Sequence, residues 1–362
     1  MEQQSIILLS TSDILYDQRL IKIATALQSF GANVSLIGRK LSDNRQNNSK
    51  KYTEKRIACV FNKGVLFYAE INLRFFFLLL FSKYNKVCAN DADTLFGAWL
   101  ASFFKKFELY YDAHEIFTEV PELEGKFIKK RIWAWVEKKG MRKAKKLYTV
   151  NESVAVFLQE KYGRKFDVIM NVPELKYQKE TNENQSFILY QGALNKGRGL
   201  KELIKAMGKI DMPLKIAGSG DIENELKILV ADLNLTDKVT FFGKLLPKDL
   251  EQITQKAYLG VNLLDKSSMN YYYSLANKFF DYAHAGIPQI GMNFPEYERI
   301  NKEFEVSLLI STLSVKEIEE AINKLIKNKE LYNNLKNNTL ALSKNYNWDK
   351  EKEKLKFIYN LA

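Results

Sequence analysis

Cysteine, histidine and proline are scarce in this 362-residue sequence, which contains two, two and six of them, respectively. Cys59 and Cys88 cannot build a disulfide framework, and neither stands at a metal-ligand spacing from the other or from His114 and His284. With 46% apolar and 27% charged residues, the composition is that of an ordinary globular protein. Disordered, collagen-like and disulfide-scaffold classes are therefore excluded, and the cysteine usage predicts a reducing, cytoplasmic location.

Long apolar runs are also missing. The longest covers residues 75–81 and is preceded by Arg74 and Glu70, whereas a membrane-spanning helix requires about 20 apolar residues. Residues 1–13 carry neither a basic lead nor a small-residue cleavage site, so no secretory signal is expected. We therefore expect a protein that does not span a membrane.

Two nucleotide-binding motifs are absent. No G-x-G-x-x-G follows a predicted strand, which disfavours an NAD-type dehydrogenase, and no G-x-x-x-x-G-K-[ST] occurs, which disfavours a P-loop NTPase.

Short β-branched and aromatic runs alternate with longer amphipathic segments along nearly the whole chain. This alternation indicates parallel sheets with crossover helices, and hence an α/β fold with two Rossmann-like domains. The polar segment 173–186 is predicted to be a linker, so we assign domains to 1–175 and 176–342 and a terminal helix to 343–362. Strands are predicted near 5–11, 33–38, 57–61, 86–90, 107–112 and 146–150, then near 187–192, 213–218, 238–243, 259–264, 288–292 and 306–310.

Glycines and basic residues follow the first predicted strand of the second half. Gly192, Gly197 and Gly199 let the backbone approach a ligand, while Lys196 and Arg198 add positive charge where a helix is expected to begin. A diphosphate fits such a loop, and an ordinary strand-to-helix turn with solvated basic residues is the alternative.

A second glycine turn, Gly218-Ser219-Gly220, follows the next strand at the same sheet edge. Alone it is weak evidence, because simple turn chemistry also explains it.

The segment 271–292 offers a further set of ligand-binding groups. Asp281 can hold a vicinal diol such as a ribose, and Ser274 can cap a helix whose first turn exposes the N–H groups of Leu275, Ala276 and Asn277. A buried helix with one polar edge explains the aromatic residues here, but not the pairing of Lys278 with Asp281.

The net charge of +12 is concentrated in one patch, because residues 126–146 hold ten Lys or Arg and one acid, Glu137. Aromatic and aliphatic residues are interleaved with these lysines, as expected of a helix that rests on an anionic membrane surface. A core helix with solvated lysines is the alternative. Nucleic acid is a weaker candidate, because no nucleic-acid-binding motif accompanies the segment.

The sequence resembles the retaining family 4 glycosyltransferases through collinear motifs that span almost the whole chain. They are D-Q-R-L with A-L-Q-S-F-G-A-N-V-S-L-I-G (17–38), C-A-N-D-A-D (88–93), Y-D-A-H-E-I-F-T-E-V-P-E-L (111–123), I-M-N-V-P (169–173), L-Y-Q-G-A-L-N-K-G-R-G-L (189–200), K-I-A-G-S-G (215–220), V-T-F-F-G (239–243), S-L-A-N-K-F-F-D-Y-A-H-A-G-I-P (274–288) and N-Y-N-W-D-K-E (345–351). The resemblance implies a GT-B fold, with two Rossmann-like domains facing a central cleft. It also implies an N-terminal acceptor side, a C-terminal nucleotide-sugar side and a last helix that returns to the N-terminal domain.

The resemblance also assigns roles within the second half. Arg198 occupies the position of the family's basic residue that neutralises the donor diphosphate, whereas a second basic position holds Ala193. The family's paired glutamates fall on Tyr273 and Asp281, so the first acid is lost and the second is replaced conservatively. We expect Lys278 to supply the charge that is missing at Ala193, and a salt bridge between Lys278 and Asp281 is the alternative.

In the first half, the resemblance places His114 near the transferred sugar, and we leave His284 as a structural residue. The pair Asp91 and Asp93 looks like the D-x-D metal motif of the other major glycosyltransferase fold, but here it matches a loop without metal. No metal or other cofactor is therefore expected.

The sequence thus predicts a cytoplasmic glycosyltransferase that takes a hexose-type sugar from a nucleotide diphosphate sugar, and it offers residues 126–146 as a contact with an anionic membrane surface. We also expect retention of configuration at the anomeric carbon. The expected acceptor is a glycan or a lipid-linked glycan, in surface polysaccharide assembly. A non-catalytic nucleotide-sugar-binding scaffold, suggested by Ala193 and Tyr273, and a sugar-nucleotide 2-epimerase remain as alternatives.

Overall fold

The computed structural model describes residues 3–15, 17–41, 52–175 and 186–361. Residues 176–185 of the predicted linker lie outside the described residues. The chain divides into two compact units: unit 1 consists of Met1–Asn171 and Glu351–Ala362, and unit 2 of Val172–Lys350. The boundaries that we predicted, 175/176 and 342/343, lie four and eight residues from these divisions.

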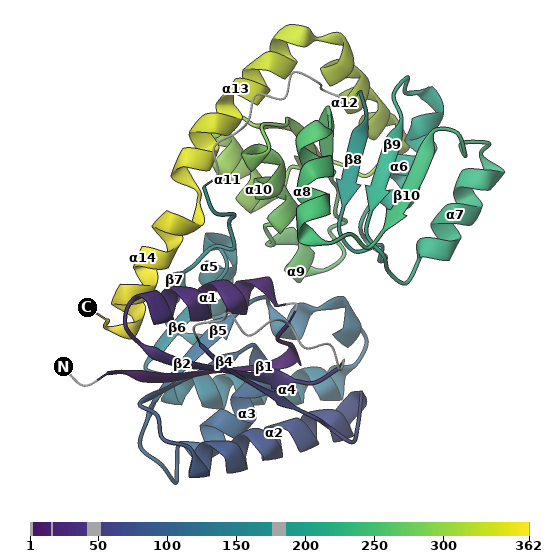
Figure 1. Ribbon diagram of the computed structural model, residues 1–362. Coiled ribbons are helices and arrows are strands. Elements are labelled where there is room, and N and C mark those ends of the chain that lie inside the picture. The colour runs from purple at the N-terminus through teal and green to yellow at the C-terminus, as the bar shows by residue number, and fades with distance from the viewer. Residues whose placement is uncertain (1–2, 16, 42–51, 176–185, 362) are drawn as a thin grey trace. The chain divides into compact units, whose positions relative to one another are not determined.

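Unit 1 is built on a parallel sheet with the strand order β3-β2-β1-β4-β5-β6-β7. Figure 1 shows α1 on one face of this sheet and α2, α3 and α4 on the other. Because both faces are covered, β4 and β5 are almost wholly buried. The strands are β1 (Ser5–Asp13), β2 (Asn33–Arg39), β3 (Thr53–Ile57), β4 (Lys86–Asn90), β5 (Glu108–Ala113), β6 (Lys146–Thr149) and β7 (Asp167–Val168). The α-helices of this part of the chain are α1 (Gln18–Ser29), α2 (Gly64–Phe81), α3 (Ala92–Ala101), α4 (Phe127–Lys143) and α5 (Glu152–Tyr162).

Unit 2 contains a parallel sheet of its own with the order β10-β9-β8-β11-β12-β13. Its strands are β8 (Ile188–Gln191), β9 (Leu214–Ala217), β10 (Val239–Gly243), β11 (Leu259–Asn262), β12 (Gln289–Met292) and β13 (Ser307–Ile310). Its α-helices are α6 (Leu200–Ala206), α7 (Glu223–Asp232), α8 (Pro247–Lys256), α9 (Met269–Tyr272), α10 (Asn277–His284), α11 (Pro295–Phe304), α12 (Val315–Lys327) and α13 (Lys329–Asn345). Two parallel-sheet α/β units confirm the predicted fold class.

One predicted strand, 57–61, is wrong. The edge strand β3 lies earlier and pairs through Thr53–Ile57 with β2. The apolar residues that suggested a strand lie in a loop, where the carboxylate of Glu70 accepts hydrogen bonds from the backbone N–H groups of Val60 and Phe61. Those N–H groups are thereby satisfied without a neighbouring strand.

Helix α2 bears on the expectation that the protein does not span a membrane. It is long and apolar enough to cross a membrane by length and composition alone, which the short uninterrupted apolar run did not reveal. In unit 1, however, α2 packs along α3. The Asn72 side chain donates to the Asp93 carbonyl at 2.7 Å and accepts from the Gly97 N–H at 2.8 Å.

The last helix, α14 (Trp348–Tyr359), ends inside the core of unit 1. The ring of Tyr359 stacks on Tyr110 with centroids 4.5 Å apart, and its hydroxyl lies 3.0 Å from the hydroxyl of Tyr148. The buried Lys86 ammonium donates to the Tyr359 carbonyl. Residues from far along the sequence therefore complete the first unit.

The strand order reverses beside the first strand of each sheet. Strand β1 lies between β2 and β4, and β8 lies between β9 and β11. In open α/β sheets, ligands bind at such switch points, beyond the carboxyl ends of the strands. Ligand-binding residues are thus expected in two sets of loops: those after β1, β4 and β5, and those after β8, β9 and β11.

The loops after β8 and β9 are in direct backbone contact. Gly192 donates from its N–H to the Ala217 carbonyl at 3.0 Å, and Leu194 donates to the Ser219 carbonyl at 3.0 Å. A Cβ at Gly218 would lie 1.8 Å from the Gly192 carbonyl oxygen, and the φ of Gly218 is +152°. Only glycine fits at this position.

We expect Gly218→Ala to lower the free energy of unfolding by about 2 kcal/mol or more, because the new methyl group forces the two loops apart. Gly208→Ala is the matched control, since a Cβ there meets no atom within 4 Å, and its effect should stay within about 0.5 kcal/mol. Denaturant unfolding measures both. Equal effects would show that the contact between Gly192 and Gly218 does not constrain the fold.

Candidate active site

The switch-point loops of unit 2 surround two cations. Arg198 comes from the loop between β8 and α6, and its guanidinium carbon lies 5.0 Å from the centre of the Tyr271 ring. Lys278 lies in the first turn of α10, with its ammonium nitrogen 3.9 Å from the centre of the Tyr190 ring and 3.7 Å from where a Cβ of Gly192 would stand. The two side chains thus converge on the loop that follows β8.

Neither cation is fully satisfied by the protein. The buried Nε of Arg198 and the buried Nζ of Lys278 have no hydrogen-bond partner among the described residues. Lys278 is only 6% exposed. The salt bridge between Lys278 and Asp281, which we considered as the alternative, is therefore not formed. A buried cation without a counter-ion is costly, so its presence indicates a place prepared for an anion.

The electrostatics of Lys278 agree with this interpretation. Burial lowers the pKa of its ammonium well below the usual value, and Arg198 lowers it further, while Asp281 opposes both. An anion bound against both side chains reverses this shift, because opposite charge favours the protonated amine.

Asp281 is bound by its own unit. Its Oδ2 accepts a hydrogen bond from Gln191 Nε2 at 3.0 Å, and Gln191 Oε1 accepts from the Thr254 hydroxyl at 2.8 Å. This chain of contacts fixes the carboxylate beside the carboxyl end of β8. Its predicted role towards a ribose stays a prediction.

The predicted helix cap at Ser274 is wrong. Helix α10 begins three residues later, at Asn277, and the Ser274 hydroxyl donates to the Tyr271 carbonyl at 2.9 Å, which closes the preceding turn. The N–H of Ala276 donates to the Tyr297 hydroxyl at 2.9 Å and is not free for a phosphate. Leu275 lies in the extended link between α9 and α10.

The remaining predicted ligand residues lie around the same loops. Gly220 packs against the loop after β8, where a Cβ would come within 2.4 Å of the Asn195 side-chain oxygen. Lys196 is exposed. His284, which we left as a structural residue, lies at the end of α10, and its Nε2 is 2.8 Å from the Tyr346 carbonyl oxygen.

Sequence reasoning missed two residues that shape this site, Tyr190 and Tyr271. Their rings lie against Lys278 and Arg198, respectively, where the negative face of an aromatic ring partly compensates a buried cation. The run of three tyrosines at 271–273 was a visible signal, but we interpreted it only as the apolar side of a helix.

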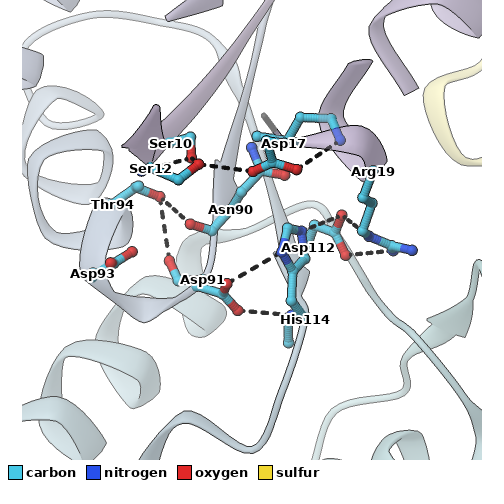
Figure 2. Close-up of polar contacts among 12 residues, drawn as sticks. Ser10, Ser12, Asp17, Arg19, Asn90, Asp91, Asp93, Thr94, Asp112 and His114 are labelled. Carbon is cyan, nitrogen blue, oxygen red and sulfur yellow. Dashed lines mark hydrogen bonds and ion pairs between the residues drawn. The ribbon is translucent and has the colours of Figure 1, made fainter. Parts of the chain in front are cut away.

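Unit 1 places a different arrangement at its own switch point, around His114 (Figure 2). The Nε2 of His114 lies 3.0 Å from Asp112 Oδ2, and its Nδ1 lies 3.3 Å from Asp91 Oδ2. Asp91 also accepts the backbone N–H of His114 at 2.7 Å. Arg19 holds Asp112 from the other side through two hydrogen bonds of 2.8 and 3.0 Å. Both ring nitrogens of His114 are therefore occupied.

These contacts favour a protonated imidazole. Burial lowers the pKa of His114, but the Asp91 and Asp112 carboxylates more than offset this effect and raise it to about 9. Burial alone would raise the pKa of Asp112, but Arg19 and His114 outweigh it and hold that pKa below its usual value. His114 thus provides a fixed positive charge, and its predicted contact with the sugar stays a prediction.

Asp91 and Asp93 point to different partners. The Asp93 carboxylate accepts from the Thr11 hydroxyl, and burial raises its pKa to about 7. Asp91 has a φ of +61° and lies against His114. Among the residues that the structure describes, no group of three or more His, Cys, Asp or Glu residues is arranged to hold a metal ion.

One family model matches part of the chain. Residues 171–341, slightly less than half of the chain, match the family model described as Glycosyl transferases group 1. This range contains Arg198, Lys278 and Asp281 and the loops that bring them together. No curated protein matches the chain.

Solved structures match over nearly the full length. A sucrose-phosphate synthase from Thermosynechococcus elongatus has a TM-score of 0.82 at 17% identity and covers 99% of this chain and 98% of its own. Anabaena HepE, in complex with UDP and glucose, has a TM-score of 0.79 at 16% identity and covers 98% of each chain. WaaG, a glycosyltransferase involved in lipopolysaccharide biosynthesis, has a TM-score of 0.73 at 14% identity and covers 98% of this chain and 99% of its own.

These likenesses show the GT-B fold, and together with the group 1 domain they support a glycosyltransferase. The predicted fold is confirmed, and so is the enzyme class.

A first prediction concerns Lys278. Lys278→Met removes an unpaired buried charge, so the free energy of unfolding of the ligand-free protein should rise by about 1–4 kcal/mol, while affinity for inorganic diphosphate falls at least about tenfold. Thermal unfolding and calorimetric titration measure the two effects. Lys205→Met, at an exposed position on α6, should change neither. A destabilised Met variant would make Lys278 a structural residue.

A second prediction concerns His114. Because its pKa in the folded protein, about 9, exceeds the unfolded value of about 6.5, its charged form stabilises the fold below pH 6.5. That contribution is lost as the pH rises through 9. With only two histidines in the chain, imidazole NMR titration of the parent and of His284→Gln assigns the signal. An apparent pKa below 7 for His114 would contradict the arrangement.

Proposed function

We propose that this chain is a retaining glycosyltransferase, of the family 4 type, that uses a nucleotide diphosphate sugar as its donor. The observation that carries this proposal is the pair of incompletely satisfied cations, Arg198 and Lys278, at the switch point of the group 1 domain. A diphosphate is the anion that two adjacent cations in such a loop cluster suit. The UDP in the HepE structure supports uridine donors as the first to test.

The proposed reaction breaks one bond and forms another at the anomeric carbon of the donor sugar. The bond between the anomeric carbon and the diphosphate oxygen breaks, and its electron pair leaves with the diphosphate. A bond forms from an acceptor hydroxyl to the anomeric carbon, and the hydroxyl proton passes to an oxygen of the leaving diphosphate. Arg198 and Lys278 stabilise the charge that grows on the leaving diphosphate, so they act more strongly in the transition state than in the ground state.

Asp281 and His114 have supporting roles in this proposal. Asp281 binds the ribose diol through its carboxylate, which Gln191 fixes beside the carboxyl end of β8. His114 contributes fixed positive charge and does not transfer a proton, since Asp91 and Asp112 already hold both of its nitrogens.

We propose a hexose as the transferred sugar and a glycan or lipid-linked glycan as the acceptor, in surface polysaccharide assembly. The part that WaaG plays in lipopolysaccharide biosynthesis supports this acceptor class. We also propose a cytoplasmic location, which the low cysteine content supports. Because two side chains already meet the charge of the leaving group, we also propose that no divalent cation is required.

The test is a donor-hydrolysis assay in the presence of a chelator. We expect slow release of UDP by the parent and a loss of about 10²–10³ in rate for Arg198→Ala, because one donor aimed at a developing anion is removed. Arg198→Lys should recover part of the rate, and Lys205→Ala is the matched control. The anomer released first, observed by proton NMR, tests retention.

Three outcomes contradict the proposal. Binding of UDP without hydrolysis or transfer of any donor indicates a scaffold, and interconversion of donors indicates an epimerase. Full loss of activity with chelator, restored by Mn²⁺, would revive a metal role for Asp91 and Asp93.

A further inference from the structure

An apolar surface extends over three helices on one face of the unit 1 sheet. Its side chains are between 47% and 85% exposed. They lie on α2, in the turn after α3, and on α4. We name this surface the α2–α4 face; it consists of Val65, Leu66, Leu73, Phe77, Phe81, Phe103, Phe104, Phe127, Ile128, Ile132 and Trp135.

Ring contacts connect the three parts into one surface. Phe76 lies 5.2 Å from Phe77 and 5.8 Å from Phe104, which joins α2 to the turn after α3. Trp99 lies 5.2 Å from Phe103 and 5.7 Å from Trp135, which joins the same turn to α4. Exposed aromatic residues scattered singly need no explanation, but a continuous surface of this kind indicates a binding partner.

Positive charge lies directly beside this apolar surface. Lys143 lies over the Phe103 ring at 5.7 Å and Arg131 over the Phe127 ring at 5.5 Å. Exposed basic side chains of α4 without an acidic partner in the described part of the chain are Lys129, Arg131, Lys138, Lys139, Arg142 and Lys143. The one acid of α4, Glu137, is buried and accepts from the Tyr111 and Tyr162 hydroxyls, so its charge does not offset these cations at the surface.

Helix α2 belongs to unit 1 as a layer on its sheet, in spite of its length and composition. A Cβ at Gly97 of α3 would come within 2.5 Å of the Asn72 carbonyl oxygen, so the two helices approach as closely as backbones allow. Glu70 is bound by Arg74 and by the loop at Val60 and Phe61. The exposed stripe of Leu73, Phe77 and Phe81 repeats every four residues, which suits a helix lying along an interface.

We propose that the α2–α4 face rests on the surface of an anionic membrane, with its apolar side chains in the headgroup and acyl boundary and its lysines against acidic headgroups. The combination of apolar area and adjacent unpaired cations matches this partner on both counts. A second copy of the chain fits less well, because a two-fold interface would set the same cations against each other. Nucleic acid fits the charge but leaves the α2 stripe exposed. This proposal is independent of the proposed function.

The test is sedimentation with phosphatidylglycerol-containing vesicles against phosphatidylcholine vesicles. We expect salt-sensitive binding to the anionic vesicles only. Changing Lys129, Lys138, Lys139 and Lys143 to Gln should weaken binding at least about 100-fold, since each basic residue near such a surface contributes separately. The matched control changes Lys248, Lys324, Lys327 and Lys329 of unit 2, all exposed, and should bind as the parent does.

A second variant tests the apolar part. Phe77→Ser with Phe81→Ser should weaken vesicle binding at least about tenfold at every salt concentration, and brominated lipid should quench tryptophan fluorescence of the parent. Circular dichroism spectra and melting temperatures that match those of the parent show that both variants are folded. The proposal is overturned if the parent stays in the supernatant at low salt, or if the unit 2 control loses binding equally. Dimerisation abolished by the Phe77 and Phe81 changes, without vesicle binding, would assign the face to a second copy.

Discussion

The desolvation of two like charges is the constraint on which the unit 2 site depends. Arg198 and Lys278 are brought together in a place where burial lowers the pKa of the lysine well below its usual value. The loops can hold them there because Gly192 and Gly218 meet backbone to backbone, and because Tyr190 and Tyr271 offer ring faces instead of carboxylates. A carboxylate in place of either ring would stabilise the empty site and weaken its attraction for a diphosphate.

The two units share a switch point in the strand order, but the charged side chains there are paired in unit 1 and unpaired in unit 2. In unit 1, the charges at the switch point are paired: Arg19 with Asp112, and His114 between Asp112 and Asp91. Such a network is rigid and satisfied before any ligand arrives. In unit 2, the positive charges of Arg198 and Lys278 are not paired with carboxylates in this way. The first arrangement neutralises its charges within the protein, whereas the second leaves positive charge that an anionic ligand can neutralise.

The sequence predicted those features of the fold and of the site that depend on short stretches of the chain. Strands, glycine turns and the basic residues beside them follow from local chemistry, so the loops around Gly192, Arg198 and Gly218 were found. The cap at Ser274 failed because its hydroxyl had a nearer acceptor in the turn before it. The double engagement of His114 and the ring partners of the cations depend on contacts between distant residues, which no spacing reveals. The same is true of the α2–α4 face, since α2 alone is as apolar as a core helix.

The place of Tyr359 in the core of unit 1 has a consequence for how the chain folds during synthesis. Its ring and carbonyl complete a core whose strands end with β7 at Val168, nearly two hundred residues earlier. Domains generally fold in order as they leave the ribosome, but unit 1 cannot close its core until all of unit 2 has been made. Unit 2, continuous in sequence from Val172 to Lys350, can therefore reach its final packing first, and unit 1 completes its core only when the last helix has been made.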